Sequence, residues 1–118
     1  MPRQILTSVL PVLLCALSIG FGQQNQLEKG IQLALAGKYE KAKGVYEEIL
    51  KTDERDAAAH YRLGLLLLRR FQNEDDAVDH IERAIELKPD NADYYMALGQ
   101  AYGEKARKAR IFKQPFLA

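Results

Sequence analysis

Three glycines are spaced almost evenly along the chain. The interval from Gly30 to Gly64 is nearly the same as the interval from Gly64 to Gly99. The letters around the second and third glycines repeat in one register: His60-x2-Leu63-Gly64-x2-Leu67 and Tyr95-x2-Leu98-Gly99-x2-Tyr102. A fixed period of about 34 residues is typical of stacked helical hairpins, and it constrains the fold more than composition does. Such arrays usually hold other molecules on a surface instead of transforming them.

Residues 1–22 differ from the rest of the 118-residue chain. Arg3 is their only charged side chain, the centre at residues 9–17 is apolar, and small residues follow at Ser18, Gly20 and Gly22. This order predicts a secretory signal peptide at residues 1–22, with cleavage after Ser18 or Gly22. The alternative is a membrane anchor at residues 5–22, because an uncharged run of about 18 residues is near the lower limit of a bilayer span. We therefore expect an exported protein, periplasmic or secreted, or one held at a membrane.

Charge and cysteine content exclude several classes of protein. The full chain has 17 basic and 16 acidic side chains, and removal of Arg3 with the signal peptide leaves 16 of each. A net charge of zero argues against a general nucleic-acid binder, which would carry a strong basic excess. Cys15 is the only cysteine and lies within the predicted signal peptide, so the mature chain has no disulfide and no thiolate metal site.

From Gln23 onward, apolar residues recur at the helical period and no strand pattern competes. Breaks occur at Gly37-Lys38, at residues 53–56, at residues 71–73 and at residues 89–91, which divide the chain into five expected helices. Asn73 is expected to cap the fourth helix, with Asp76 three residues on in a capping-box-like arrangement.

These motifs resemble those of tetratricopeptide-repeat proteins. The second repeat carries most of the family pattern: Leu63-Gly64, Ala77-x3-Ile81, Ala84 and Leu87-Lys88-Pro89-Asp90-Asn91. The first repeat carries the following subset: Gly30, Gly37-Lys38-Tyr39, Ala42-x3-Tyr46 and Ile49-Leu50. The resemblance implies an all-α solenoid of about two and a half repeats, at residues 23–56, 57–91 and 92–106, the last one incomplete. A basic and apolar tail at residues 107–118 would follow.

Within such a hairpin, small residues let two helices approach closely. Gly30, Gly64 and Gly99 are expected to admit the second helix of each repeat, because a larger side chain would strain the packing by about 1–3 kcal/mol. Two departures from the family pattern stand out. Glu54 replaces a common proline, which predicts a looser first turn, and one extra residue near Phe71 predicts a longer second turn with that ring folded inward.

The third repeat lacks its second helix. Repeat arrays usually need about three repeats and a polar cap. The pattern favours a truncated member of a longer array, and the alternative is a tail that folds back on the open face.

Residues that could carry chemistry are few. His60 and His80 could form a metal or acid–base pair with Asp79, but a packing residue and a surface residue are the favoured interpretation. No cofactor, metal or catalytic site is predicted, so the expected protein is not an enzyme. The basic stretch at residues 104–110 could bind phosphate, nucleic acid or anionic lipid. A solvated helix face with a Glu104–Lys108 pair is the favoured interpretation.

The remaining candidate is a groove lined by the first helix of each repeat, which would suit an extended or helical segment of a partner protein. Its predicted lining residues are Leu27, Ile31, Tyr61, Arg62, Leu65, Arg69, Met96 and Gln100. The alternative is that Leu27, Leu65 and Met96 only pack between helices. A carboxylate clamp of the chaperone-binding type is excluded, because only Arg62 could serve and Asp93 would repel the ligand. We thus expect a non-enzymatic interaction module, or alternatively a fragment that self-associates through its open C-terminal face.

Overall fold

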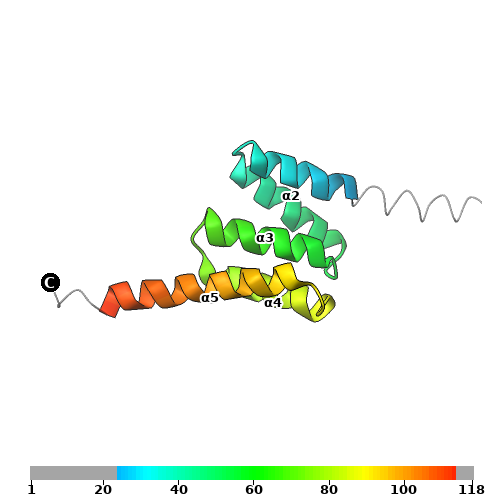
Figure 1. The fold of residues 1–118 in the computed structure, drawn as a ribbon. Helices are drawn as coiled ribbons and strands as arrows, with labels where there is room; N and C mark the ends of the chain where they lie inside the picture. Colours follow the sequence, from blue (N-terminus) through cyan, green and yellow to red (C-terminus); the bar gives the residue numbers. More distant parts are fainter. Residues whose placement is uncertain (1–23, 114–118) are drawn as a thin grey trace, which may run out of the picture.

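The computed structural model describes residues 24–113, and within them all regular structure is helical (Figure 1). The helices are an N-terminal helix at residues 24–35, α2 (Tyr39–Thr52), α3 (Ala57–Arg69), α4 (Glu74–Leu87) and α5 (Ala92–Lys113). This confirms the expected all-α fold with five helices. The predicted signal peptide or anchor lies outside the described residues, as does the end of the tail at residues 114–118. Within the described range, no helix is both long and apolar enough to cross a membrane.

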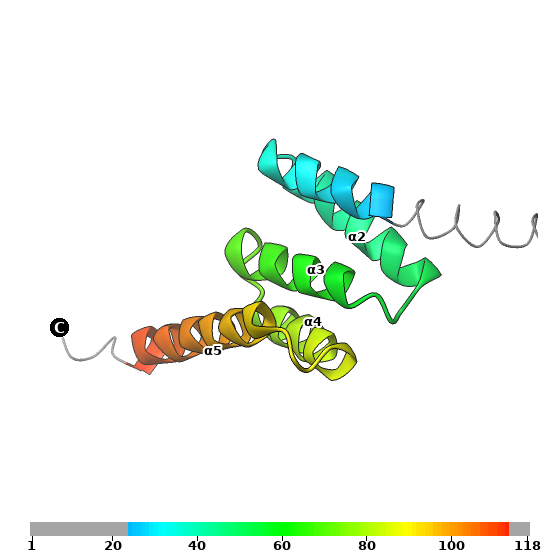
Figure 2. The ribbon, with the colours of Figure 1, turned by 45° about the vertical axis from the view of Figure 1, so that its right-hand side comes forward.

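The helices stack as consecutive hairpins. The N-terminal helix lies beside α2, and α3 lies between that pair and the α4–α5 pair (Figure 2). α3 contacts α2, α4 and α5, so it is covered on several sides. Its six consecutive residues 63–68 are accordingly all buried. The core therefore runs through α3 and takes its largest fully buried side chains from the neighbouring helices: Tyr46, Ile49 and Ile81.

Side-chain caps set the beginnings of α3 and α4. Asp56 accepts a hydrogen bond of 3.0 Å from the backbone N–H of Ala59. Asn73 accepts one of 3.2 Å from the N–H of Asp76, and its amide donates to the Asp76 carboxylate at 2.8 Å. Each cap satisfies a donor that the first helical turn would otherwise leave unpaired. The predicted cap at Asn73 is confirmed.

Two of the three repeated glycines admit a neighbouring helix. A Cβ atom at Gly30 would lie 2.5 Å from the Tyr46 ring, and one at Gly64 would lie 2.7 Å from Ile81 Cγ1. Both distances are shorter than real Cβ contacts, so a side chain at either glycine would force its neighbour to shift. At Gly99 a Cβ atom would meet nothing within 4 Å. The expectation for Gly99 is wrong because no second helix packs against α5 at this position in the described part of the chain.

The turn between α3 and α4 is one residue longer than the turn before α2. The N–H of Lys38 donates to the carbonyl of Leu33, five residues back, whereas the N–H of Asn73 reaches Leu67, six residues back. Gln72 takes the left-handed backbone conformation, with φ of 52°, that Gly37 takes in the first turn, with φ of 79°. The extra residue predicted near Phe71 is confirmed. The Phe71 ring packs partly buried against the core.

The turn at residues 53–56 is fastened by side chains, so the prediction of a looser turn is wrong. Asp53 Oδ1 accepts from the N–H of Arg55 at 3.0 Å, and Nε2 of His60 lies 2.8 Å from the carbonyl oxygen of Glu54. The next repeat makes the corresponding contact, because the Tyr95 hydroxyl donates to the Pro89 carbonyl at 2.6 Å. His60 and Tyr95 thus occupy equivalent positions in successive repeats, and each binds the backbone carbonyl of the residue six positions earlier.

The glycine contacts predict opposite effects of the same substitution. Gly64→Ala should lower the free energy of unfolding by about 1–2 kcal/mol, because the new methyl group collides with Ile81 and with the Ala77 carbonyl oxygen, 3.2 Å away. Gly99→Ala should raise it by about 0.5–1 kcal/mol, because alanine favours the helix and meets open space. Urea unfolding followed by circular dichroism measures both. Destabilisation by Gly99→Ala would show that another segment packs there.

Candidate partner-binding groove

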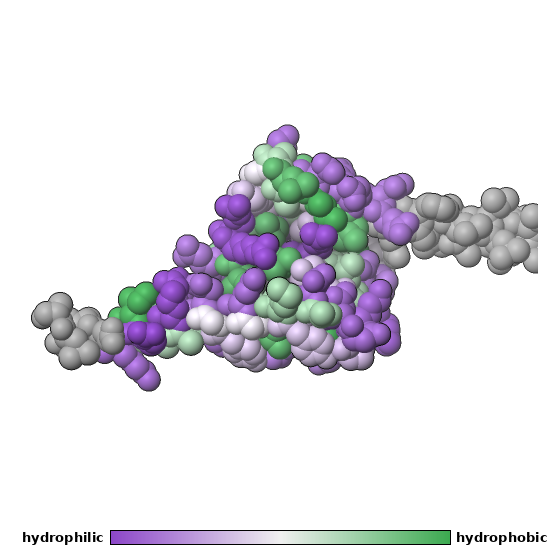
Figure 3. All heavy atoms as spheres, in the orientation of Figure 1, coloured by the Kyte–Doolittle hydropathy of each residue, from purple (hydrophilic) through white to green (hydrophobic). Residues whose placement is uncertain are grey.

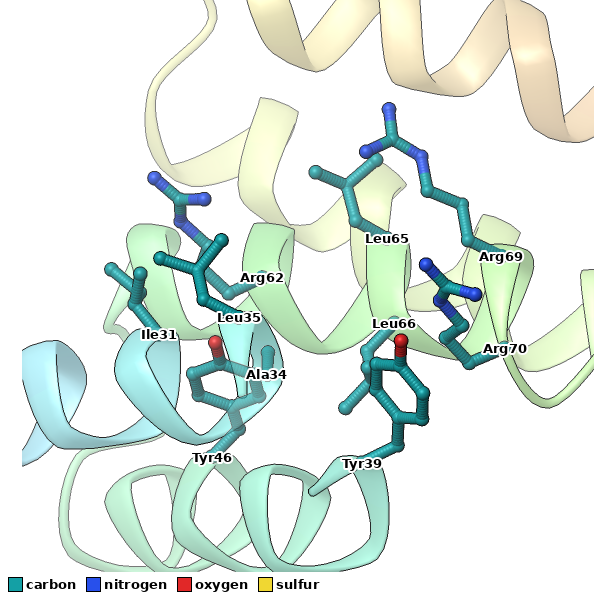
Figure 4. A pocket seen from close by; sticks show the side chains of 10 residues that line it. All are labelled: Ile31, Ala34, Leu35, Tyr39, Tyr46, Arg62, Leu65, Leu66, Arg69 and Arg70. Carbon is teal, nitrogen blue, oxygen red and sulfur yellow. The ribbon is translucent and has the colours of Figure 1, made fainter. Parts of the chain in front are cut away.

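Two adjoining cavities lie along the side of the array formed by the N-terminal helix, α3 and α5. The first, of about 190 Å³, lies between the N-terminal helix and α3, with side chains of α2 at its base (Figure 4). The second, of about 80 Å³, lies between α3 and α5. Leu65 and Arg69 line both cavities. We call the two cavities together the groove.

The first cavity combines apolar walls with cationic edges. Its aliphatic lining comes from the N-terminal helix and α3: Ile31, Ala34, Leu35, Leu65 and Leu66. The hydroxyl groups of Tyr39 and Tyr46 point into it from α2 (Figure 4). Arg62 and Arg69 belong to α3, and Arg70 is the residue that follows this helix. In Figure 3, hydrophobic atoms run along the N-terminal helix, and strongly hydrophilic atoms border them over α3.

The structure brings seven of the eight predicted groove residues to the two cavities. Ile31, Arg62, Leu65 and Arg69 line the first cavity. Tyr61, Met96 and Gln100 line the second cavity, together with Leu65 and Arg69, which line both. Leu27 lines neither cavity and packs partly buried against the core. That these residues bind a partner stays a prediction.

Exposure separates the structural residues of the groove from the accessible ones. Leu65 is only 9% exposed and belongs to the core, and Leu27 packs partly buried against it. Met96, in contrast, is 65% exposed. Leu35 is 77% exposed at the edge of the first cavity, and it was not predicted from the sequence although it follows Ile31 by one helical turn. Leu35 and Met96 are therefore the apolar side chains that a partner can reach.

The arginines of the groove contact tyrosine rings and a glutamine side-chain amide. Arg70 lies over the Tyr39 ring, 4.5 Å from its centroid, and Arg62 lies over Tyr61 at 5.8 Å. Arg69 donates to Oε1 of Gln100 at 3.4 Å. Sequence reasoning missed Arg70, because its stacking on Tyr39 joins two different repeats and leaves no local pattern.

A family model described as tetratricopeptide repeat matches residues 27–91 and 70–109. The chain belongs to the tetratricopeptide-repeat family. Repeats of this family generally mediate protein–protein interaction, and the family is typically a non-enzymatic interaction module. No curated protein matches the chain.

The two histidines of this tetratricopeptide array form a pair on the side away from the groove. Nδ1 of His60 lies 3.0 Å from Nδ1 of His80. The Glu54 carbonyl can only accept, so Nε2–H of His60 donates to it, and one of the two Nδ1 atoms donates to the other. The expectation that His80 is a simple surface residue is wrong, because its ring is partly buried and bonded to His60.

The histidine pair lacks further ligands for a metal. Among residues 24–113, no group of three or more histidine, cysteine or acidic side chains is placed to hold an ion. The pair instead joins α3, α4 and the 53–56 turn through hydrogen bonds. It is therefore best described as a structural link between the first and second repeats.

Two lysines of the basic stretch contact the beginning of α4. Lys108 Nζ lies 2.7 Å from the Glu74 carboxylate and donates to the Gln72 carbonyl at 3.0 Å, and Lys105 lies 2.8 Å from Asp75. Lysine hydrogen bonds hold the pKa of both Glu74 and Asp75 below the ordinary range. The predicted Glu104–Lys108 pair is wrong, because Glu104 binds Arg107 instead. Residues 107–113 continue α5, so no structural boundary separates them from residues 92–106.

The histidine pair predicts how stability depends on pH. Burial and the nearby His60 lower the pKa of His80 below 6.5, although the carboxylates of Asp76, Asp79 and Glu47 oppose the shift. As the pH falls, His80 therefore becomes protonated in the unfolded chain at a higher pH than in the folded protein. The contribution of His80 to folding stability is lost as the pH falls below about 6.5. His80→Gln should remove this dependence. Urea unfolding of both proteins at about pH 7.5 and pH 5 tests it, and a parallel decline of both would contradict the assignment.

Proposed function

We propose that this chain is an interaction module that binds an exposed segment of a partner protein along the groove, outside the cytoplasm. One observation carries the proposal: a cavity that is open to solvent joins apolar walls to positioned arginines. A volume of about 190 Å³ fits one large apolar side chain, since an engineered cavity of about 150 Å³ holds benzene. Action outside the cytoplasm is supported by the signal-peptide pattern of residues 1–22.

Residue Leu35 gives the most direct test of the groove. A photocrosslinking side chain at position 35 should form an adduct with a discrete partner in the native organism, because this position is exposed at the edge of the first cavity. The matched control places the same group at Lys51, an exposed α2 residue that does not line the groove. Identical adducts from the two positions would contradict the proposal.

Substitution of the exposed apolar residues of the groove should abolish binding of the partner. Leu35→Asp with Met96→Asp should remove the position-35 partner from complexes isolated with the protein, while helicity and the urea midpoint stay unchanged. Leu65→Asp is unsuitable because it would bury a charge in the core. Unchanged recovery of the partner by the folded double variant would refute groove binding.

The open face of α5 supports a second candidate function, association with another copy of the chain. Gly99 occupies the position at which the other repeats receive a Tyr or Ile side chain, and nothing lies within 4 Å of its added Cβ. Tyr95 and Tyr102, on the same face, remain 49% and 47% exposed. A helix from a second copy could cover these side chains.

Sedimentation equilibrium tests this second candidate. If copies associate through α5, Gly99→Arg should weaken association by about tenfold or more, because the long side chain blocks the empty position. Gly44→Arg is the control, since Gly44 also faces open space but lies on α2. A protein that stays monomeric at all concentrations, or equal effects of the two substitutions, would exclude the α5 interface.

A further inference from the structure

We propose that the segment bound in the groove is acidic, with carboxylate side chains that flank an apolar anchor. This inference rests on the proposed groove function and assigns the chemistry of its partner. The first cavity would then bind carboxylate side chains at internal positions of the partner, and a free C-terminus of the partner would not be required.

Among residues 24–113, the groove arginines form no ion pair with a carboxylate. Among the described residues, Arg83 and Arg107 form ion pairs with Glu86 and Glu104, at 2.9 and 2.7 Å. The ion pairs of the same region include none from the three groove arginines: Arg62, Arg69 and Arg70. Among the described residues, three positive charges thus border an apolar cavity without forming an ion pair.

These arginines are also positioned in advance. Arg70 lies 4.5 Å from the centroid of the Tyr39 ring and Arg62 lies 5.8 Å from that of Tyr61. Such cation–π contacts restrain the side chains and do not use their N–H groups in ion pairs. Arg69 uses one N–H toward Gln100 and keeps the others. A planar guanidinium with free edges binds a carboxylate through two parallel hydrogen bonds, and prior ordering lowers the entropic cost.

The spacing of the arginines along α3 matches that of side chains in an extended segment. Arg62 and Arg69 lie two helical turns apart, which corresponds to about 10.5 Å along the axis. An extended polyproline-like segment repeats its side-chain direction every three residues, or about 9 Å. Acidic residues three positions apart therefore match the two arginines, and Leu65 between them leads to the cavity that would take the intervening apolar side chain.

Two acidic groups limit where carboxylates can bind. Glu28, on the N-terminal helix, is close enough to Tyr46 to raise its pKa, but burial is the main cause of the rise and Arg62 acts in the opposite direction. Asp93 lines the second cavity beside Arg69. Because of Asp93, the part of the segment that crosses the second cavity should be neutral or basic. Carboxylates should bind over the first cavity, where three arginines outnumber Glu28.

Fluorescence anisotropy with defined peptides tests the inference. The probe is a labelled peptide with two Glu-Leu-Pro units, blocked at both ends so that no terminal carboxylate is present. We expect the matched Gln-Leu-Pro peptide to bind at least about tenfold more weakly and the Lys-Leu-Pro peptide not to bind. Added salt should weaken binding of the Glu probe.

A pair of triple variants separates the groove from general charge. Arg62→Gln, Arg69→Gln and Arg70→Gln together should weaken binding of the Glu probe by at least about tenfold. The control removes the same charge outside the groove, by Arg55→Gln, Arg83→Gln and Arg110→Gln, and should change the affinity less than about twofold. Circular dichroism and urea unfolding establish that both variants are folded.

The outcomes distinguish this inference from the groove proposal. Equal binding of the Glu and Gln peptides, lost with Leu35→Asp, would overturn the acidic preference and leave groove binding intact. Equal weakening by the two triple variants would show unspecific attraction and overturn the inference. Absence of binding by the Glu probe would also overturn it, whereas crosslinking at position 35 decides the groove proposal independently.

Discussion

Close approach of paired helices at glycine is the constraint on which the rest of the structure depends. Tyr46 and Ile81 occupy the space that a side chain at Gly30 or Gly64 would need, so a larger residue there would displace the second helix and destabilise the hairpin. Burial of these two side chains fixes the second helix of each repeat against the first. The separation of the N-terminal helix from α3, and with it the width of the first cavity, follows from how the two hairpins then stack.

Much of the fold could be predicted because its determinants are local or strictly periodic. The glycine period, the Asn73 cap and the extra residue near Phe71 each leave a signal within a few positions of the sequence. Gly99 fits the same glycine period but lacks the close helix contact that Gly30 and Gly64 make. A sequence motif indicates only what a repeat position usually packs against. The partner helix itself is a separate segment, and the described residues contain none at that place.

The candidate site could be predicted only in part, because its properties depend on residues from different repeats. Helical register placed Arg62 and Arg69 on one face of α3, as the structure shows. The helical register alone does not predict that helices on both sides bury Leu65 whereas Leu35 is exposed. The histidine pair and the Lys108–Glu74 contact join residues 20 and 34 positions apart, which no local pattern specifies.

Chemical-shift mapping of amide resonances tests the central claim most directly, since it locates the bound segment on the protein. Isotopically labelled protein titrated with the two-unit Glu-Leu-Pro peptide should show shifts concentrated at residues 31–35 and 62–70, which border the first cavity. Residues 74–87 of α4, which do not line that cavity, should stay unchanged. Shifts confined to α5 and absent from residues 31–35 and 62–70 would contradict the account, because they would place binding away from the first cavity.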